Sequence, residues 1–175
     1  VSIGVFGQRF AEIARRFGAN VEEVNVEWGK AVDLQVIRDI IAKDINFDIK
    51  AILITHNETS TGVFNDVKLL KAALGEHPAL IIVDAVSSLA ALELEMDEWE
   101  LDVVISGSQK AFMVPPGLSF IAFNDRALKA HKESKMPRFY WDITLGMEYL
   151  EKGQTPFTPA LSVFFALQEA LRMMQ

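Results

Sequence analysis

The sequence predicts an α/β domain with a mainly parallel sheet and helices on both faces, a three-layer sandwich. Short apolar runs recur along the chain, segments with helical periodicity lie between them, and each run ends in polar residues. Strands buried on both faces of a parallel sheet have such apolar runs, and right-handed crossovers place helices over both faces. The 175 residues suit one folding unit, since domains usually have about 100–200 residues.

Five segments are expected to be strands, because they are short and rich in β-branched and apolar residues. They are 20–26, where valine recurs, and the runs 50–55, 79–84, 102–106 and 118–123.

The expected helices carry apolar residues at helical spacing or begin after a capping residue. They are 7–17, which Gly18 ends; a helix that Asp33 caps and that carries Leu34, Ile37, Ile40 and Ile41; 65–74; one that begins at Asn124 or Asp125 and runs to about Lys132; and 159–174, with a wide apolar face. The polar and basic segment 131–140 is expected to be a surface loop.

The composition narrows the classes of function. Half of the residues are hydrophobic and 23% are charged, which favours a packed core over disorder. The net charge of −7, with scattered basic residues, argues against a nucleic-acid partner. The chain has no cysteine, so disulfides and thiolate metal sites are excluded. No apolar run reaches the roughly 18–20 residues that span a bilayer. We therefore expect a cytoplasmic protein without a membrane partner.

Polar residues follow three of the expected strands, at 55–62, 84–88 and 106–110, and Pro115, Pro116 and Gly117 mark the third stretch as part of a loop. Ligands of open parallel sheets bind beyond the carboxyl ends of the strands. These three segments are therefore where the sequence places the chemistry.

Two charged residues in these segments are the candidates for catalysis. Lys110 follows a strand and a Ser/Gly turn and precedes apolar residues, so its amine is expected to be partly desolvated, which lowers an amine's pKa and suits a nucleophile. Asp84 ends an apolar strand, where a lone carboxylate needs a partner such as a cationic ligand nitrogen. The alternatives are a solvated loop lysine and a carboxylate with a structural hydrogen bond.

Four motifs, in this order, connect these residues to a known family: THNETSTG at 55–62, VDAVSS at 83–88, SGSQKAFMVPPG at 106–117 and GQTPFTP at 153–159. Lys110 follows Asp84 by 26 positions. The set resembles the class V branch of the fold-type I pyridoxal-phosphate enzymes, and most of all the serine–pyruvate and alanine–glyoxylate aminotransferase group. The resemblance extends from Phe6 to Thr158.

The resemblance implies pyridoxal 5′-phosphate as the cofactor and two central roles. Lys110 would hold the cofactor as a Schiff base and later move a proton at the substrate α-carbon. Asp84 would pair with the cofactor's pyridine nitrogen and keep it protonated.

Further positions are assigned by the same resemblance. Thr59 would contact the ring oxygen and Gln109 the phosphate, while Val86 and Phe6 would pack on the two faces of the ring. Without the motifs, Thr59 is a turn hydroxyl, Gln109 a surface amide, and Val86 and Phe6 are core residues.

Thr155 and Thr158 match phosphate contacts that the family supplies from the neighbouring subunit, which implies a homodimer with shared active sites. The alternative is that both are turn and cap residues ahead of a helix.

A metal site is not expected, because the chain has only three histidines and they are not clustered. His56, one residue past a strand end, is weighed as a contact of the cofactor site but is more simply structural. The acidic run 93–102 is expected to be a solvated edge with Trp99 packed inward.

The resemblance implies that residues 1–175 are the cofactor-binding large domain, incomplete at its N-terminus and without the small C-terminal domain. The expected reaction is transamination between a small amino acid, alanine or serine, and a 2-oxo acid, glyoxylate or pyruvate. Another class V enzyme is an alternative: a lyase, or a cysteine desulfurase, although desulfurases usually have histidine where Gln109 stands. A non-catalytic α/β binding domain is the third possibility, although neither common phosphate-loop motif occurs.

Overall fold

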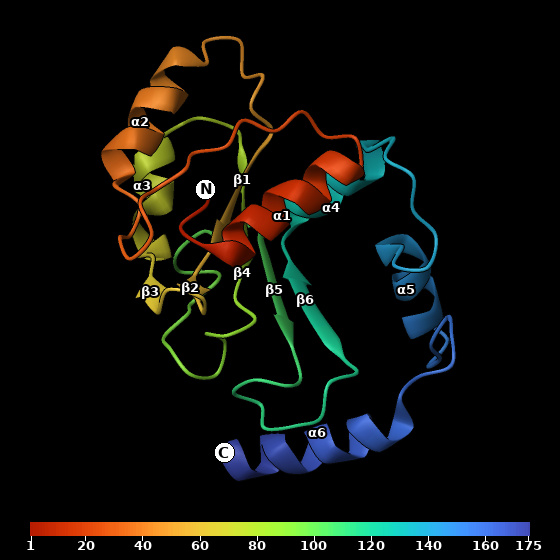
Figure 1. Ribbon diagram of the computed structural model, residues 1–175. Helices are drawn as coiled ribbons and strands as arrows, with labels where there is room; N and C mark the ends of the chain where they lie inside the picture. Colours follow the sequence, from red (N-terminus) through yellow and green to blue (C-terminus); the bar gives the residue numbers. More distant parts are fainter.

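The computed structural model describes residues 1–175 and contains a four-stranded sheet at its centre (Figure 1). The strands are β1 (Ala51–Thr55), β4 (Leu80–Asp84), β5 (Val103–Gly107) and β6 (Ser119–Phe123), in the spatial order β1-β4-β5-β6. The first three are parallel and β6 is antiparallel to β5. The four long apolar runs of the sequence are therefore the four strands, and the predicted α/β fold with a mainly parallel sheet is confirmed.

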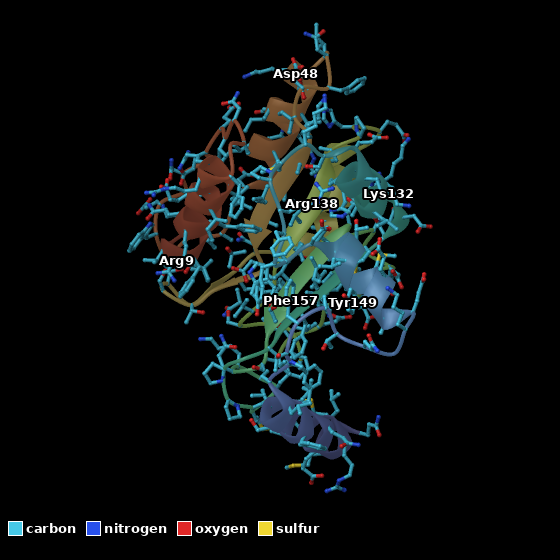
Figure 2. The ribbon with its side chains drawn as sticks, turned by 90° about the vertical axis from the view of Figure 1, so that its right-hand side faces the viewer. Arg9, Asp48, Lys132, Arg138, Tyr149 and Phe157 are labelled. Atoms are coloured by element: carbon cyan, nitrogen blue, oxygen red, sulfur yellow. The ribbon has the colours of Figure 1, made fainter.

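Helices lie on both sides of this sheet. The sheet passes between α1 (Val5–Arg16), which carries Arg9, and α4 (Asp125–Glu133), which carries Lys132 (Figures 1 and 2). The helix α2 (Leu34–Lys43) begins where the sequence predicted, because the Asp33 carboxylate accepts the Gln35 N–H. Asn124 caps α4 in the same way through the Ala127 N–H.

The core lies between the sheet and the helices α2 and α3 (Leu70–Leu74). Ile54, Ile81 and Val83 of the sheet are at most 1% exposed, and Leu70 of α3 is fully buried. Burying a side chain of this size stabilises a fold by about 1.5–3 kcal/mol. The core therefore fixes β1 and β4, and with them the residues at the carboxyl ends of these strands.

Two predicted elements differ from the structure. The segment 20–26 is not a strand: it forms a single bridge to Ser2, because the chain turns into α1 at Val5 and leaves no second strand to continue the pairing. The segment 65–74 is a 3₁₀ turn, Val67–Leu69, followed by α3. Its first residue, Asn65, instead joins two loops through the Thr55 carbonyl and the Val32 N–H.

Two elements were missed by the sequence analysis. A short hairpin, β2 (Asn57–Glu58) and β3 (Val63–Phe64), follows β1 directly, and α5 (Ile143–Leu150) lies after the exposed loop that was expected near 131–140.

The last helix, α6 (Leu161–Met174), confirms the predicted helix to within two residues; in Figure 1 it lies below the sheet, whereas α5 lies to the right of the sheet. Ala170 is the only buried residue of the two helices. The apolar face of α6 is therefore uncovered in the single chain; its exposed large side chains are Leu161, Phe164, Phe165, Leu171, Met173 and Met174. None of the helices combines the length and the hydropathy that crossing a bilayer requires.

Candidate active site

The carboxyl ends of β1, β4 and β5 meet at one edge of the sheet, with Asp84 in the middle. Asp84 is paired in register with Thr55 on one side and with Ile105 on the other. The His56 N–H donates to the Asp84 carbonyl at 2.9 Å, and the Ala85 N–H donates to the Ile105 carbonyl at 2.8 Å. The three polar segments predicted from the sequence therefore start side by side.

The Asp84 carboxylate is partly buried and has no cationic partner. Its Oδ1 accepts the Val86 N–H at 2.9 Å, and none of the ion pairs in the chain includes it. Burial raises the pKa of Asp84 above its ordinary value, and the nearby Glu58 carboxylate adds to the rise, while the Val86 N–H opposes it. A cationic group placed here would relieve this unfavourable charge.

The β2–β3 hairpin is tied to the turn that follows Asp84. The Asn57 side-chain amide donates to Ser87 Oγ at 2.9 Å, and the same hydroxyl donates to the Asn57 carbonyl at 2.8 Å. Thr59 lies in the turn of this hairpin and is exposed. The structure thus brings the loops of Thr59 and Val86 together, and Val86 is half-buried beside Asp84.

A buried carboxylate that the sequence analysis did not single out lies in the same hairpin. Glu58 has no exposed surface and accepts the backbone N–H groups of Phe6 and Gly7, each at 3.0 Å. Burial alone would raise the pKa of Glu58, but the hydrogen bonds from Ser60, Gly7 and Phe6 outweigh it and lower the pKa. Glu58 therefore stays ionised and joins the start of α1 to the site.

Phe6 lies in the first turn of α1, where its N–H donates to Glu58. Its side chain is half-buried, and the Arg9 guanidinium lies 5.3 Å from the centre of the ring. A cation over an aromatic face at this distance is a cation–π contact. One face of Phe6 is thus occupied by Arg9.

Lys110 lies in the loop that connects β5 and β6, and Ser108 holds this loop. Ser108 is fully buried; its Oγ donates to the Pro115 carbonyl at 2.7 Å and accepts the Leu118 N–H at 3.3 Å. Lys110 is exposed in this chain, which differs from the expected partial desolvation of its amine. It lies just beyond the end of β5, the strand that pairs with β4, and β4 ends in Asp84.

Gln109 is exposed but folds back over the end of β5. A Cβ atom added at Gly107 would lie 2.8 Å from Gln109 Oε1, so the amide group lies close to the backbone of Gly107. Gln109 and Lys110 follow directly after β5 in the chain.

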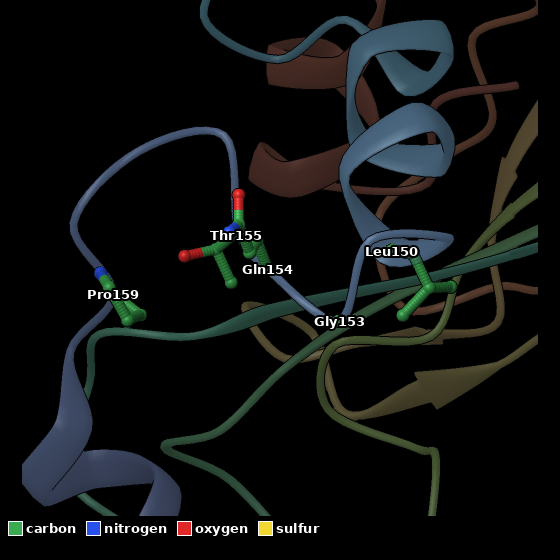
Figure 3. Close-up of a pocket in the computed structure, with 5 residues that line it drawn as sticks. All are labelled: Leu150, Gly153, Gln154, Thr155 and Pro159. Atoms are coloured by element: carbon green, nitrogen blue, oxygen red, sulfur yellow. The ribbon is translucent and has the colours of Figure 1, made fainter.

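Thr155 and Thr158 are not part of this group within the chain. Both are exposed and lie between α5 and α6, outside the sheet. Thr155 lines an open hollow of about 640 Å³ together with Leu150, Gly153, Gln154 and Pro159. Figure 3 shows these five residues. The Thr155 hydroxyl donates to the Phe157 carbonyl at 2.8 Å, which is the turn role that the sequence left open.

The His56 side chain is buried among Ser88, Phe64 and Trp99. The imidazole has no exposed surface, shares a hydrogen bond of 2.9 Å with Ser88 Oγ through Nδ1, and packs against Phe64 and Trp99. Burial lowers the pKa of His56, with a smaller opposing effect from Asp66. Trp99 is 5% exposed, as predicted, but Asp102 at the end of the acidic run is fully buried rather than solvated. No three potential metal ligands gather anywhere in the structure.

Comparison with known protein families agrees with this arrangement. The model of the family described as aminotransferase class-V matches residues 8–175. The chain belongs to the class-V aminotransferases. Members of this family are pyridoxal-phosphate enzymes.

Similar proteins carry more than one name. A serine–glyoxylate aminotransferase of Arabidopsis thaliana is 40% identical over 97% of this chain and 43% of its own length. A protein of Anabaena cylindrica named the soluble hydrogenase 42 kDa subunit is 45% identical over 99% of this chain and 46% of its own length. The chain therefore spans about half the length of the curated relatives it matches.

Solved structures show the same fold. The structure of a ureidoglycine–glyoxylate aminotransferase from Bacillus subtilis superposes with a TM-score of 0.90 at 34% identity, over 99% of this chain and 45% of the other. An alanine–glyoxylate aminotransferase from Nostoc sp. gives 0.90 at 28% identity, over 98% and 46%. A cysteine desulfurase from Thermococcus onnurineus, at 16% identity and 0.67, shares the fold.

The residues present fit pyridoxal phosphate. The partly buried Asp84 carboxylate has no cationic partner and suits a protonated ring nitrogen. Lys110 offers an exposed amine in the loop after the neighbouring strand β5.

Proposed function

We propose that residues 1–175 are the cofactor-binding large domain of an aminotransferase that moves the amino group of alanine or serine to glyoxylate or pyruvate. The observation that carries the proposal is the Asp84 carboxylate, which forms no ion pair and ends β4, the strand that pairs with β5 just before the Lys110 loop. The names of the relatives support glyoxylate as the acceptor of the amino group, since serine–glyoxylate and alanine–glyoxylate aminotransferases are among them.

Bound pyridoxal phosphate would supply an electron sink for the pair of electrons released when the substrate α-carbon loses its proton. Asp84 would keep a proton on the ring nitrogen, because the ion pair stabilises the charge that burial alone disfavours. Lys110 would bind the cofactor covalently through its amine and, once released by the substrate, take the proton from the α-carbon as a general base. The exposure of its side chain leaves it free to move between these two tasks.

The remaining residues would orient the cofactor. Thr59 would bind the ring oxygen through its hydroxyl, and Gln109 the phosphate through its amide. Val86 and Phe6 would pack against the two faces of the ring; Phe6 would use the face that Arg9 leaves free.

A homodimer with shared sites accounts for the positions of Thr155 and Thr158. Their exposure, away from Asp84 in the same chain, suits contact with the phosphate bound by a second subunit. Hybrid dimers test this: one subunit carries Lys110→Ala and the other carries Thr155→Ala with Thr158→Ala. Shared sites predict that the hybrid regains one intact site and about half of the wild-type activity; no recovery would contradict the proposal.

The reaction is tested with the full-length protein loaded with cofactor. Adding alanine should bleach the visible absorption of the bound cofactor, and glyoxylate should restore it with formation of glycine. Borohydride reduction followed by peptide mapping should place a pyridoxyl adduct on Lys110; Lys110→Ala should abolish the adduct and Lys129→Ala, on the exposed side of α4, should not. An adduct on another lysine, or an unchanged absorption and no glycine, would refute the assignment.

A cytoplasmic location is part of the proposal, because a chain without cysteine gains nothing from an oxidising compartment. Cell fractionation tests it. Two of the relatives are named as hydrogenase subunits. Residues 1–175 contain no cysteine, so they offer no thiolate ligand to a metal cluster.

A further inference from the structure

The first three backbone N–H groups of α1 are all bound by side chains of the β2–β3 hairpin. The Val5 N–H donates to Ser60 Oγ at 3.0 Å, and those of Phe6 and Gly7 donate to Glu58 Oε2. The other carboxylate oxygen, Oε1, accepts the Ser60 N–H at 3.1 Å and the Ser60 hydroxyl at 2.6 Å. Glu58 is thus a fully buried acceptor of four hydrogen bonds, two from each segment.

The chain before α1 is shaped for this contact. Gly4 holds the N-cap position, where it offers no side chain to the N–H groups of the helix. A Cβ atom at Gly4 would lie 2.5 Å from Ser60 Oγ and 2.6 Å from Glu58 Cγ, so a larger residue would push the hairpin away. Gly4 therefore does not cap α1 itself, but it leaves the space that Ser60 and Glu58 need to accept the first N–H groups of the helix.

Glu58 also acts on the charge of the site. It is ionised, faces the positive end of the α1 dipole, and lies near enough to Asp84 to disfavour ionisation of that carboxyl. Neither carboxylate forms an ion pair, and the hairpin that holds Glu58 is joined to the turn after Asp84 by the hydrogen bonds between Asn57 and Ser87.

We propose that Glu58 is a positioning residue of the cofactor site: it fixes Phe6 relative to Thr59 by joining the start of α1 to the hairpin turn, and it adds a negative charge to the hairpin that Asn57 and Ser87 join to the turn after Asp84. The inference rests on the proposed function for the identity of the ligand. The joint between α1 and the hairpin, and the charge coupling to Asp84, are properties of the chain without cofactor.

Glu58→Gln tests both parts, because it keeps the size of the side chain but removes its charge and places an NH₂ group against two of the four donors. In the cofactor-free protein, amide exchange of Phe6 and Gly7 should quicken at least tenfold, since hydrogen bonds to a charged acceptor are worth about 1.5–3 kcal/mol. The carboxyl of Asp84, followed by ¹³C NMR, should titrate at lower pH than in the wild type. The dissociation constant for pyridoxal phosphate should rise about tenfold or more.

Two further variants keep the test decisive. Ser60→Ala retains the charge but removes the acceptor of the Val5 N–H and one donor to Glu58, so it should quicken exchange at Val5 and leave the titration of Asp84 unchanged. Glu98→Gln, an exposed acid with no hydrogen-bonding partner, is the matched control and should alter none of these measurements.

An unchanged titration of Asp84 together with unchanged exchange at Phe6 in Glu58→Gln would overturn the inference, even if Lys110 carries the cofactor. Conversely, if no pyridoxyl adduct forms on Lys110 but the exchange and titration change as expected, the proposed function fails and the positioning role of Glu58 stands for another ligand.

Discussion

Replacing Ser108 with alanine should loosen the loop that carries Lys110 without unfolding the sheet. The substitution removes the donor to the Pro115 carbonyl and the acceptor of the Leu118 N–H at a fully buried position. The donated bond contributes about 1 kcal/mol, and leaving two polar groups without a partner adds about 1–2 kcal/mol. The expected loss in the free energy of unfolding is therefore about 2–3 kcal/mol.

Two backbone hydrogen bonds should keep the loop in place after this change. The Ser108 N–H donates to the Leu118 carbonyl at 3.1 Å, and the Val114 N–H donates to the Ser108 carbonyl at 3.2 Å. The lost free energy should consequently appear mainly as local opening of the loop. The rate of amide exchange at Leu118 should rise about 30-fold or more, because each 1.4 kcal/mol is a factor of ten. Turnover with cofactor should fall, since Lys110 would spend less time in its working position.

Urea denaturation and amide exchange measure the two effects, and Ser119→Ala, an exposed serine on β6, is the control. A difference below about 0.5 kcal/mol between the two variants, which is the usual range for surface substitutions, would refute the reasoning. An amide exchange rate at Leu118 equal to that of the wild type would also refute the reasoning.

Substitutions at Asp102 and Asp84 also have expected outcomes. Asp102→Ala should cost about 1–3 kcal/mol in urea denaturation, because it leaves the buried Ile81 N–H without its acceptor, whereas Asp102→Asn should cost less and Glu98→Ala almost nothing. Burial raises the pKa of Asp84, so its protonated form stabilises the folded cofactor-free protein below the unfolded pKa of about 3.9, and this stability is lost as pH rises through the folded pKa. The free energy of unfolding of Asp84→Asn, relative to that of the wild type, should therefore increase with pH. A difference that does not change with pH would show that folding does not raise the pKa of Asp84. With cofactor, the same variant should lose most of its transaminase activity, because an amide cannot hold the proton on the ring nitrogen.

The sheet and two of the site positions were predictable from sequence because a single local pattern marks them. The runs that became β1 and β4 are apolar and short, and the polar residue that ends each run lies at the carboxyl edge of the sheet. Asp84 could therefore be placed at the end of a strand from the sequence, and Lys110 in the loop after the next strand. The exposure of Lys110 could not, since it depends on what else packs around the loop.

Glu58 and Asp102 were missed because no local pattern in the sequence marks them as buried. Each is an acid in a polar stretch, which resembles a solvated surface, and each is buried by partners far along the chain: Phe6 lies 52 positions from Glu58, and Asn124 lies 22 positions from Asp102. Helix α5 was missed because its residues are apolar on several sides and show no single buried face. The segment 20–26 had the composition of a strand but lacked a neighbouring strand to pair with.

The cap of α1 from a distant hairpin also constrains how the protein folds. A short helix without its cap frays at the first turn, and the bonds that finish α1 come from residues more than fifty positions away. The first turn of α1 should therefore become ordered only after β1 and the hairpin have docked, which makes it a late event of high contact order. A chain emerging from the ribosome would make the body of α1 first and complete its start only when residues 57–64 had been synthesised and folded.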